Sequence, residues 1–185
     1  MDPAVQTPPA LLTAEEFARR HNGEFVELID GKVEPIMPGG TRHGQVCVIL
    51  SRIVGGFIDD HGLGVVCSHD TFVLTQRNPD RVRGADLVYW SRERWSGVVP
   101  DGMIEAPPDL VVEVRSPTDR WGDVQIKIGE YLNAGVRVVV LLDPKSATVY
   151  VHRQDELQQL LHNGDELTLS DVLPGFVVPI ARFFE

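Results

Sequence analysis

The sequence has few cysteines and no long apolar run, and each shortage excludes a class of protein. Cys47 and Cys67 are the only two cysteines in 185 residues, and they form no CxxC pair. This excludes a disulfide scaffold and is typical of a reducing compartment. The longest apolar stretch, 136–142, contains Arg137 and is too short to span a bilayer, and the first residues lack the basic and apolar regions of a secretion signal. We therefore expect a cytoplasmic protein without membrane contact.

Lysine and net positive charge are also scarce. The chain has 17 Lys and Arg against 27 Asp and Glu, a formal net charge of -10, which argues against a protein that coats nucleic acid by charge alone. The segment 73–137 is different, because it holds nine basic and ten acidic residues. Lys32, Lys127 and Lys145 are the only lysines in the sequence. A local basic strip is thus compatible with the sequence, and a mechanism that needs a lysine has three candidates.

The residues that are present form alternating helix and strand patterns. Hydrophobic residues make up 43% and charged residues 24% of the chain, as in a folded globular protein. We expect a flexible leader over residues 1–12 and a single domain over residues 13–185. Within it the patterns predict helices over 14–20 and 43–60, and a third helix that is capped at Ser116 and runs to about Asn133. They predict a hairpin over 25–37 around Asp30-Gly31 and a small terminal hairpin from 166–169 and 176–180. The remaining predicted strands are 65–74, 82–90, 110–115, 136–142 and 148–152. This order predicts an α/β fold with a mixed β-sheet, flanking helices and an N-terminal β-hairpin.

Two acidic residues interrupt two of the predicted strands. Asp86 lies within 82–90, and Glu113 lies within 110–115. A buried charge is costly unless it is paired or holds a metal. One interpretation is a structural ion pair in which Arg83 or Arg115 neutralises these carboxylates. The other is a divalent-metal site, because carboxylates on adjacent strands with a backbone carbonyl beside them supply the hard oxygen ligands that Mg²⁺ prefers.

Lys127 lies on the predicted helix that follows Glu113. At 100° per residue it flanks the apolar face of this helix, so that its side chain can point along the sheet. The simpler interpretation is an exposed ion pair with Asp123, one turn earlier, which stabilises an isolated helix by only a few tenths of a kcal/mol. The presence of Asp86 and Glu113, two acids in neighbouring strands, favours the first interpretation.

Several short motifs are spread along the chain. They are Glu27-Leu28-Ile29-Asp30-Gly31, His43-Gly44, Ala85-Asp86-Leu87, the run from Pro108 to Val114, Ser116-Pro117, Lys127 with Tyr131, Ala134-Gly135-Val136, Leu142-Asp143-Pro144 and Leu173-Pro174-Gly175-Phe176. None of them is specific alone, but their order and spacing resemble the Uma2 family, also called DUF820, of the PD-(D/E)XK nuclease superfamily. The resemblance runs from about Thr13 to Phe184.

The resemblance implies a restriction-endonuclease-like core that hydrolyses DNA phosphodiesters with Mg²⁺ or Mn²⁺. Asp86 and Glu113 would ligate the ion, with the backbone carbonyl of Val114 beside them. Lys127 would correspond to the lysine of the superfamily, moved from the strand to the helix, and would orient or activate the attacking water. Glu27 is a further candidate near the metal. A homodimer is expected on DNA, because cutting both strands takes two sites.

The sequence departs from the superfamily pattern at two positions. Ala85 replaces the proline that usually precedes the first aspartate. Arg115 occupies the position where many members keep their lysine, and an arginine cannot act as a base at neutral pH. It could clamp a phosphate or neutralise Glu113. Glu27 and His43 also have simpler interpretations, as a charge on a hairpin and as a residue near a helix start.

Other sites and other functions have less support. His61, Cys67 and His69 lack a fourth ligand for zinc, and strand alternation with burial of the cysteine explains them more simply. The main rival function is a catalytically inactive nucleic-acid or protein interaction module on the same fold. A third is a phosphohydrolase of small nucleotides. Carboxyl oxygens of Asp86 and Glu113 within about 5 Å of each other would allow both to ligate one ion.

Overall fold

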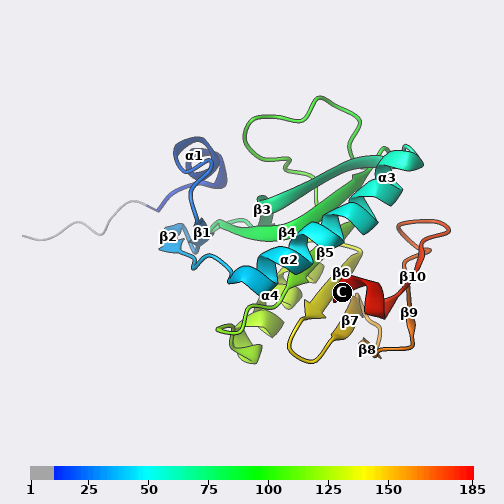
Figure 1. Ribbon diagram of the computed structural model, residues 1–185. Coiled ribbons are helices and arrows are strands. Elements are labelled where there is room, and N and C mark those ends of the chain that lie inside the picture. Colours follow the sequence, from blue (N-terminus) through cyan, green and yellow to red (C-terminus); the bar gives the residue numbers. More distant parts are fainter. Residues whose placement is uncertain (1–10) are drawn as a thin grey trace, which may run out of the picture.

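Eight strands form one mixed sheet through the middle of the molecule (Figure 1). The structure, a computed structural model, describes residues 11–185. The strands follow the order β2-β1-β4-β5-β6-β7-β8, and β3 pairs with the other edge of β4. Only β5 and β6 pair in parallel within this sheet. Its strands are β1 (Val26–Ile29), β2 (Lys32–Pro35), β3 (Gly64–Gln76), β4 (Arg81–Ser91), β5 (Leu110–Val114), β6 (Val138–Asp143), β7 (Thr148–Arg153) and β8 (Gln159–Leu161).

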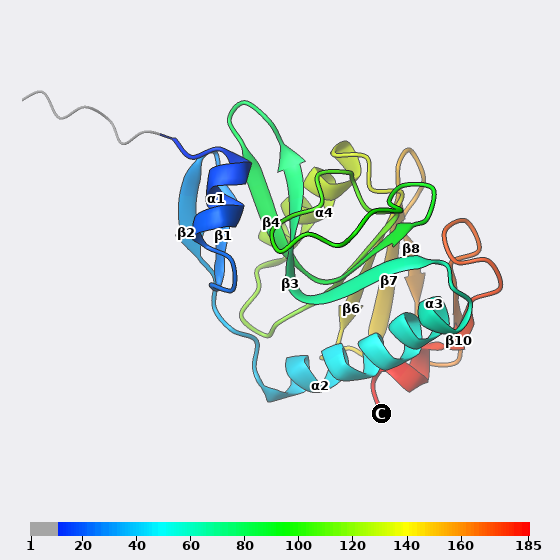
Figure 2. The same cartoon turned by 90° about the horizontal axis from the view of Figure 1, so that it is seen from above.

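Helices cover both faces of the sheet, as Figure 2 shows for α2 and α4. On one face α2 (Thr41–Leu50), a π-helical turn η1 (Ser51–Gly55) and α3 (Gly56–Asp60) form one continuous helical rod. On the other face lies α4 (Trp121–Asn133). Alternate residues of the central strands divide between these layers, with Leu87 and Val112 packed toward the rod and Val88 and Val111 packed toward α4. This confirms the predicted α/β fold with a mixed sheet between helices.

The N-terminal unit is the predicted helix and hairpin. α1 (Ala14–Arg20) begins with a capping box, in which the Thr13 hydroxyl accepts from the Glu16 N–H at 3.2 Å and the Glu16 carboxylate accepts from the Thr13 N–H at 3.4 Å. Phe17 of α1 packs on Leu28 of β1 in a small core cluster of its own. Of the predicted leader, residues 1–10 lie outside the described part of the chain, and the Leu12 N–H donates to the Gly31 carbonyl at 2.9 Å.

The C-terminal region contains the predicted small hairpin and one strand that the sequence patterns missed. β9 (Glu166–Thr168) and β10 (Val177–Pro179) pair antiparallel, and the 3₁₀ turn η2 (Ile180–Phe183) follows. The missed strand is β8, three residues that pair with β7. It is only three residues long, which is too short for an alternation of polar and apolar residues to indicate a strand. Within residues 11–185, no helix has the length and apolar character that crossing a membrane requires.

The start of the last helix differs from the prediction. α4 begins at Trp121, with Arg120 at the N-cap, rather than after a cap at Ser116. The carboxylate of Asp119 accepts from the Ser116 N–H at 2.7 Å, and the Asp119 N–H donates back to the Ser116 carbonyl at 3.1 Å. This local turn competes with the helix for the same backbone groups. Residues 115–120 therefore form a loop that leaves β5 and passes over the edge of the sheet.

Candidate active site

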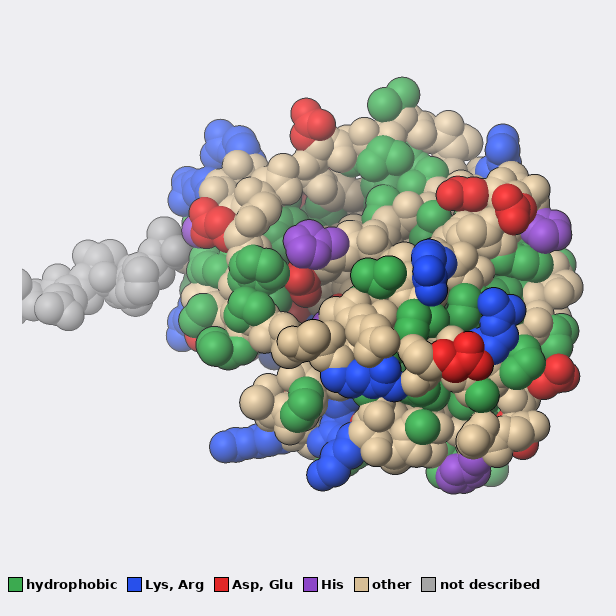
Figure 3. Space-filling view, in the orientation of Figure 1, with side chains coloured by type: hydrophobic (Ala, Val, Ile, Leu, Met, Phe, Trp, Pro, Cys, Tyr) green, Lys and Arg blue, Asp and Glu red, His purple; other side chains and the backbone are tan. Residues whose placement is uncertain are grey.

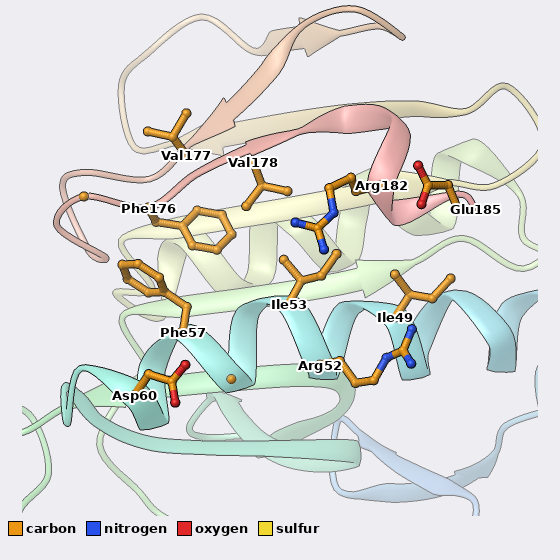
Figure 4. Close-up of a pocket in the computed structure, with 12 residues that line it drawn as sticks. Ile49, Arg52, Ile53, Phe57, Asp60, Phe176, Val177, Val178, Arg182 and Glu185 are labelled. Carbon is orange, nitrogen blue, oxygen red and sulfur yellow. The ribbon is translucent and has the colours of Figure 1, made fainter.

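Two cavities of similar volume differ in the side chains that line them. A groove of about 620 Å³ lies between the helical rod and the C-terminal segment, where Figure 4 shows Ile53 and Phe57 facing Phe176. Its walls combine apolar side chains with four charged ones spread around the groove, namely Arg52, Asp60, Arg182 and Glu185. A second cavity, of about 580 Å³, contains all four side chains that the sequence predicted to carry the chemistry, namely Glu27, Asp86, Glu113 and Lys127. The second cavity is therefore the candidate site.

This cavity lies where two strands separate from the same edge of β4. β1 pairs with β4 at Val82, and β5 pairs with it only from Leu87 onward. Between them, Gly84 has no strand partner on this edge within the described residues. Its N–H donates to Glu27 Oε1 at 3.1 Å, and its carbonyl accepts from Lys127 Nζ at 2.7 Å. The side chains of Glu27 and Lys127 thus make the hydrogen bonds to Gly84 that a neighbouring strand would otherwise supply, and both side chains are held at this point as a result.

Glu113 and Lys127 form the centre of the cluster. Lys127 Nζ lies 3.0 Å from Glu113 Oε1 and 3.3 Å from Glu27 Oε1. Tyr131, one turn further along α4, donates its hydroxyl to Glu113 Oε1 at 2.7 Å. Lys127 therefore faces the sheet, and the alternative pairing with Asp123 at the surface is wrong. The three donors of the ammonium are all engaged, by two carboxylates and one carbonyl.

Glu27 is held by two cations. Besides Lys127 it accepts from Arg83 Nη1 at 2.7 Å, and Arg83 also pairs with Glu130 of α4 at 2.6 Å. A hairpin charge without a further role would be exposed, but Glu27 is buried. Arg83 thus neutralises Glu27 and Glu130, and among the described residues it makes no ion pair with Asp86 or Glu113. The structural ion pair that the sequence suggested for Arg83 exists, but with different acids.

Asp86 lies at the same edge of β4 but turns toward the other helix layer. Its Oδ2 accepts from the Val114 N–H at 2.7 Å and lies 3.4 Å from His43 Nε2, and its Oδ1 lies 3.6 Å from the Cys47 thiol. Asp86 directly precedes the paired residues of β4, and Glu113 directly follows those of the antiparallel β5, so that the two acids occupy opposing positions where the strands part. The structure thus brings Asp86 to the cavity without a direct contact to Lys127.

A β-bulge in β3 lies opposite Asp86, and no signal in the sequence predicted it. Ser68 pairs with Leu87 and Thr71 with Ala85, so that His69 and Asp70 together face the single residue Asp86. Both bulged residues have left-handed backbone conformations, with φ of 71° and 52°. Non-glycine residues rarely adopt this conformation, and bulges of this kind occur next to active sites, where they redirect a side chain. The bulge adds Asp70 to the lining of the cavity.

Arg115 does not neutralise Glu113. Its Nη1 pairs with Asp143 at 3.2 Å, its Nη2 donates to the Asp119 carbonyl at 3.1 Å, and its guanidinium lies over the ring of Trp121 at 4.4 Å. The Nε hydrogen is buried and has no partner within the described residues. Arg115 lines the cavity in this fixed orientation. Of the two roles that the sequence left open, the neutralisation of Glu113 is therefore wrong, because the ion pair of Arg115 is with Asp143.

Burial and charge shift the protonation equilibria of the cluster in opposite directions. Burial and, to a smaller extent, the Asp86 carboxylate together raise the pKa of Glu113 to about 7, against the nearby ammonium of Lys127. Burial lowers the pKa of Lys127, but the carboxylates of Glu113 and Glu27 outweigh it and hold this pKa above its usual value. The hydrogen bond to Asp86 raises the pKa of His43 to about 11. The site therefore contains a firmly protonated lysine next to a carboxyl group that is difficult to ionise.

The donor set of this cavity fits a hard divalent cation. Asp70, Asp86 and Glu113 line it with carboxylate oxygens, which are the ligands that Mg²⁺ and Mn²⁺ prefer. A bound cation would favour the ionised form of Glu113, whose pKa burial raises. Val114 also lines the cavity, and its N–H is already engaged by Asp86. The composition of the cavity thus agrees with a metal site.

Basic and acidic side chains both line the cavity near the start of α4, where Arg115 and Arg120 lie with Asp119 and Asp123. Figure 3 shows Lys and Arg side chains at the lower left of this face, over the start of α4, whereas acidic and basic side chains are mixed over the rest. Arg115 and Arg120 belong to the lining at this end. The exposed fraction of Trp121 is 39%, so part of its ring is open to solvent beside them. Trp90, by contrast, is buried, with its indole N–H donating to the Ala106 carbonyl at 2.7 Å.

Comparison with known proteins identifies the family. A family model described as "Uma2: Putative restriction endonuclease" matches residues 13–181. A solved structure described as a "putative nuclease belonging to DUF820" from Anabaena variabilis ATCC 29413 matches with a TM-score of 0.76 and 19% identity, over 94% of this chain and 97% of that chain. That likeness shows a shared fold, and a search of curated proteins found no match. Because the family model covers most of the sequence, the chain belongs to the Uma2 family.

Proposed function

We propose that this protein is a metal-dependent endonuclease that hydrolyses DNA phosphodiester bonds. Asp86 and Glu113, with the backbone carbonyl of Val114, would hold one Mg²⁺ or Mn²⁺, and Lys127 would act beside the attacking water. The observation that supports this proposal is the meeting of carboxylates and one lysine in a single cavity at the point where β1 and β5 leave β4. The family description agrees with it.

The metal ion would polarise the scissile phosphate and lower the pKa of bound water. The protein side chains prepare this chemistry before any substrate arrives. Asp86 is fixed by the Val114 N–H at 2.7 Å, and Glu113 is fixed by the Tyr131 hydroxyl at 2.7 Å. Such second contacts hold the ligand oxygens in place and keep them from searching many rotamers. Preorganised carboxylates bind a divalent ion without a large entropy loss.

Lys127 is suited to stabilise negative charge rather than to remove a proton. Its pKa is held above the usual value by Glu113 and Glu27, so the side chain is an ammonium at neutral pH. Its contact with Glu113 Oε1 at 3.0 Å occupies one of its three N–H groups. Once Glu113 turns away to a different partner, that N–H can donate to the attacking water or to a phosphate oxygen. The ammonium then offsets the charge that develops in the pentacoordinate transition state.

DNA would reach the cavity past Arg115 and Arg120, which line it near the start of α4. Arg115 is held by Asp143 and lies over the Trp121 ring, so it would offer a fixed guanidinium to a phosphate. Phosphate contacts of this kind make binding strongly dependent on salt. A net charge of -10 leaves little general attraction to DNA, so we expect weak binding at physiological salt. A homodimer that presents two such sites would cut both strands.

Cleavage of supercoiled plasmid tests the proposal. The purified protein is incubated with Mn²⁺ or Mg²⁺, and nicked and linear products are measured on gels. We expect Asp86→Asn, Glu113→Gln and Lys127→Met each to lower the rate by at least about 100-fold, the effect of removing one catalytic group. Lys145→Met is the matched control, because Lys145 is exposed in a turn and is not among the residues that line the cavity, so its loss should leave the rate unchanged.

The outcomes separate the proposal from its rivals. Cleavage that persists in all three variants would show a contaminating nuclease and overturn the assignment of the site. A folded protein that binds Mn²⁺ through Glu113 and leaves every DNA substrate intact would favour a non-catalytic interaction module. Hydrolysis of small nucleotides without plasmid nicking would point to a phosphohydrolase instead.

A further inference from the structure

The opposite side of Asp86 borders a separate cavity. This cavity, of about 630 Å³, lies between the start of α2 and the bulge of β3, and His43, Cys47 and Asp86 all line it. Asp70 and Asp86 also belong to the cavity of the proposed nuclease site, so these two acids form part of the wall between the two spaces. His43 was only a weak candidate from the sequence, and Cys47 was interpreted as a small buried hydrophobe. The structure places both in a chemical setting of their own.

The three side chains come together from two elements. His43 and Cys47 are four residues apart on α2 and therefore share one face of the helix. The Cys47 sulfur lies 3.5 Å from His43 Nδ1 and 3.6 Å from Asp86 Oδ1, and His43 Nε2 lies 3.4 Å from Asp86 Oδ2. Taking one donor atom from each residue, all three atoms lie within 4.8 Å of one another. Within residues 11–185 no other group of three His, Cys, Asp or Glu side chains meets in this way.

These separations match the edges of a tetrahedral metal site. Ligand bonds of about 2.0 Å for nitrogen or oxygen and about 2.3 Å for sulfur place tetrahedral neighbours roughly 3.3–3.6 Å apart. The observed separations of 3.4, 3.5 and 3.6 Å fall in that range. They join different atoms, because the imidazole presents Nδ1 to Cys47 and Nε2 to Asp86, and Asp86 presents Oδ1 to the sulfur and Oδ2 to the imidazole. With one donor atom from each residue the set lies within 4.8 Å, and an ion would draw these atoms together through rotation of the side chains.

The donor types decide which cation fits. One thiolate, one imidazole and one carboxylate form a mixed sulfur, nitrogen and oxygen set, which favours Zn²⁺ and similar transition metals over Mg²⁺. Three protein ligands leave the fourth position open to the cavity, as in metal sites that bind water or a substrate. Asp86 is held from behind by the Val114 N–H, which fixes the carboxylate as outer contacts do in known metal sites.

We propose that His43, Cys47 and Asp86 form a cation site selective for a zinc-class divalent ion. It lies on the other side of Asp86 from Glu113 and uses none of the remaining nuclease residues. It does not depend on whether the protein cleaves DNA. Because Asp86 is shared, an ion here would also change the charge of the carboxylate that the nuclease site uses.

Titration of the reduced full-length protein with Co²⁺ tests this site directly. A cysteine ligand gives a near-ultraviolet thiolate-to-cobalt absorption, which carboxylates and water cannot produce. We expect this band to saturate at one Co²⁺ per chain, to disappear on addition of equimolar Zn²⁺, and to persist in a large excess of Mg²⁺. Zn²⁺ should also raise the Tm of the protein by preferential binding to the folded state.

Three variants locate the site. Cys47→Ser should abolish the thiolate band, and His43→Ala should weaken Co²⁺ binding by more than about tenfold, in line with the loss of contacts in known sites. Cys67→Ser is the matched control, because Cys67 is half-buried on β3 outside the lining of this cavity and should leave the band unchanged. Circular dichroism confirms that each variant is folded before titration.

The test separates this site from the nuclease proposal. Glu113→Gln should retain the cobalt band even where it removes cleavage, and a protein that cleaves nothing should still show it. The proposal is overturned if the native protein gives no thiolate band, or if the band survives Cys47→Ser. Loss of the band in Cys67→Ser would equally contradict it, because it would move the sulfur ligand to the other cysteine.

Discussion

Replacing Lys127 by Met tests how the buried charges of the site affect the stability of the fold. Methionine has a similar length and keeps the apolar stem, but it removes the ammonium that contacts Glu113 at 3.0 Å, Glu27 at 3.3 Å and the Gly84 carbonyl at 2.7 Å. Glu27 keeps its second cation, because Arg83 remains 2.7 Å away. Glu113 keeps only the Tyr131 hydroxyl. The main effect of the change therefore falls on Glu113.

The expected loss of stability follows from this geometry. Breaking a buried ion pair by removing one partner costs about 3–5 kcal/mol, because the remaining charge is left without compensation. The side chain of Lys127 is 23% exposed, so solvent screens part of this interaction. Glu113 can also take up a proton, since burial already raises its pKa to about 7. We therefore expect the free energy of unfolding to fall by about 2–4 kcal/mol near pH 8.

The loss should depend on pH with a defined sign. A carboxyl whose pKa is higher in the folded state than the unfolded value of 4.5 binds its proton more tightly when folded. Such a group stabilises the folded state at low pH, and this contribution is lost as the pH rises through the pKa that the group has in the folded state. Removing Lys127 raises the pKa of Glu113 further. The deficit of Lys127→Met relative to the native protein should thus be smaller near pH 5.5 than near pH 8.

Urea unfolding followed by circular dichroism measures these differences. Lys145→Met controls for the loss of an exposed lysine and should change the free energy of unfolding by less than about 0.5 kcal/mol. The double variant Lys127→Met with Glu113→Gln should recover most of the loss, because it removes both buried charges together. This account of the site would be refuted if Lys127→Met lowered the free energy of unfolding equally at both pH values. It would also be refuted if the losses of the two single variants simply added in the double variant.

Two further predictions concern side chains around the site and the sheet. In the metal-free protein, NMR should find His43 protonated up to about pH 9, because the hydrogen bond to Asp86 raises its pKa to about 11. Burial lowers the pKa of His152, so this imidazole should lose its proton at a lower pH than an ordinary histidine. Coincident titration of both imidazoles near pH 6.5 would contradict these environments. Arg115→Gln should weaken DNA binding and reduce the salt slope by about one counterion, because it removes one positive charge from the lining of the cavity. Fluorescence anisotropy at several salt concentrations checks this, and an unchanged slope would exclude the phosphate contact.

Local signals in the sequence predicted most of the elements. The capping box at Thr13, the Asp30-Gly31 turn and the apolar periodicity over 43–60 each use residues close together in the chain, and each element formed there. The start of α4 was wrong, because Asp119 uses its carboxylate to close a turn on Ser116 rather than to cap the helix. A polar residue near a helix start can satisfy either arrangement, and the sequence does not distinguish them.

The sequence predicted the acidic residues of the candidate site but not the residues that pair with them. Acids within apolar strands need compensation, which correctly singled out Asp86 and Glu113 as unusual. Which groups compensate them depends on contacts between distant parts of the chain. Asp86 pairs with His43 and Glu113 with Lys127, not with Arg83 or Arg115. Because strand register and the β3 bulge set these partners, no spacing in the sequence indicates them.

The π-helical turn at Ser51–Gly55 has a consequence for the whole helical rod. A π turn winds one residue more than an α turn, so that the helix beyond it is rotated by about 100° relative to an uninterrupted one. The first half of the rod thereby directs its side chains at Asp86, and the second half directs Phe57 at the C-terminal groove. Deleting a single residue within this turn would change the phase of one half against the other, and both surfaces would lose their alignment together.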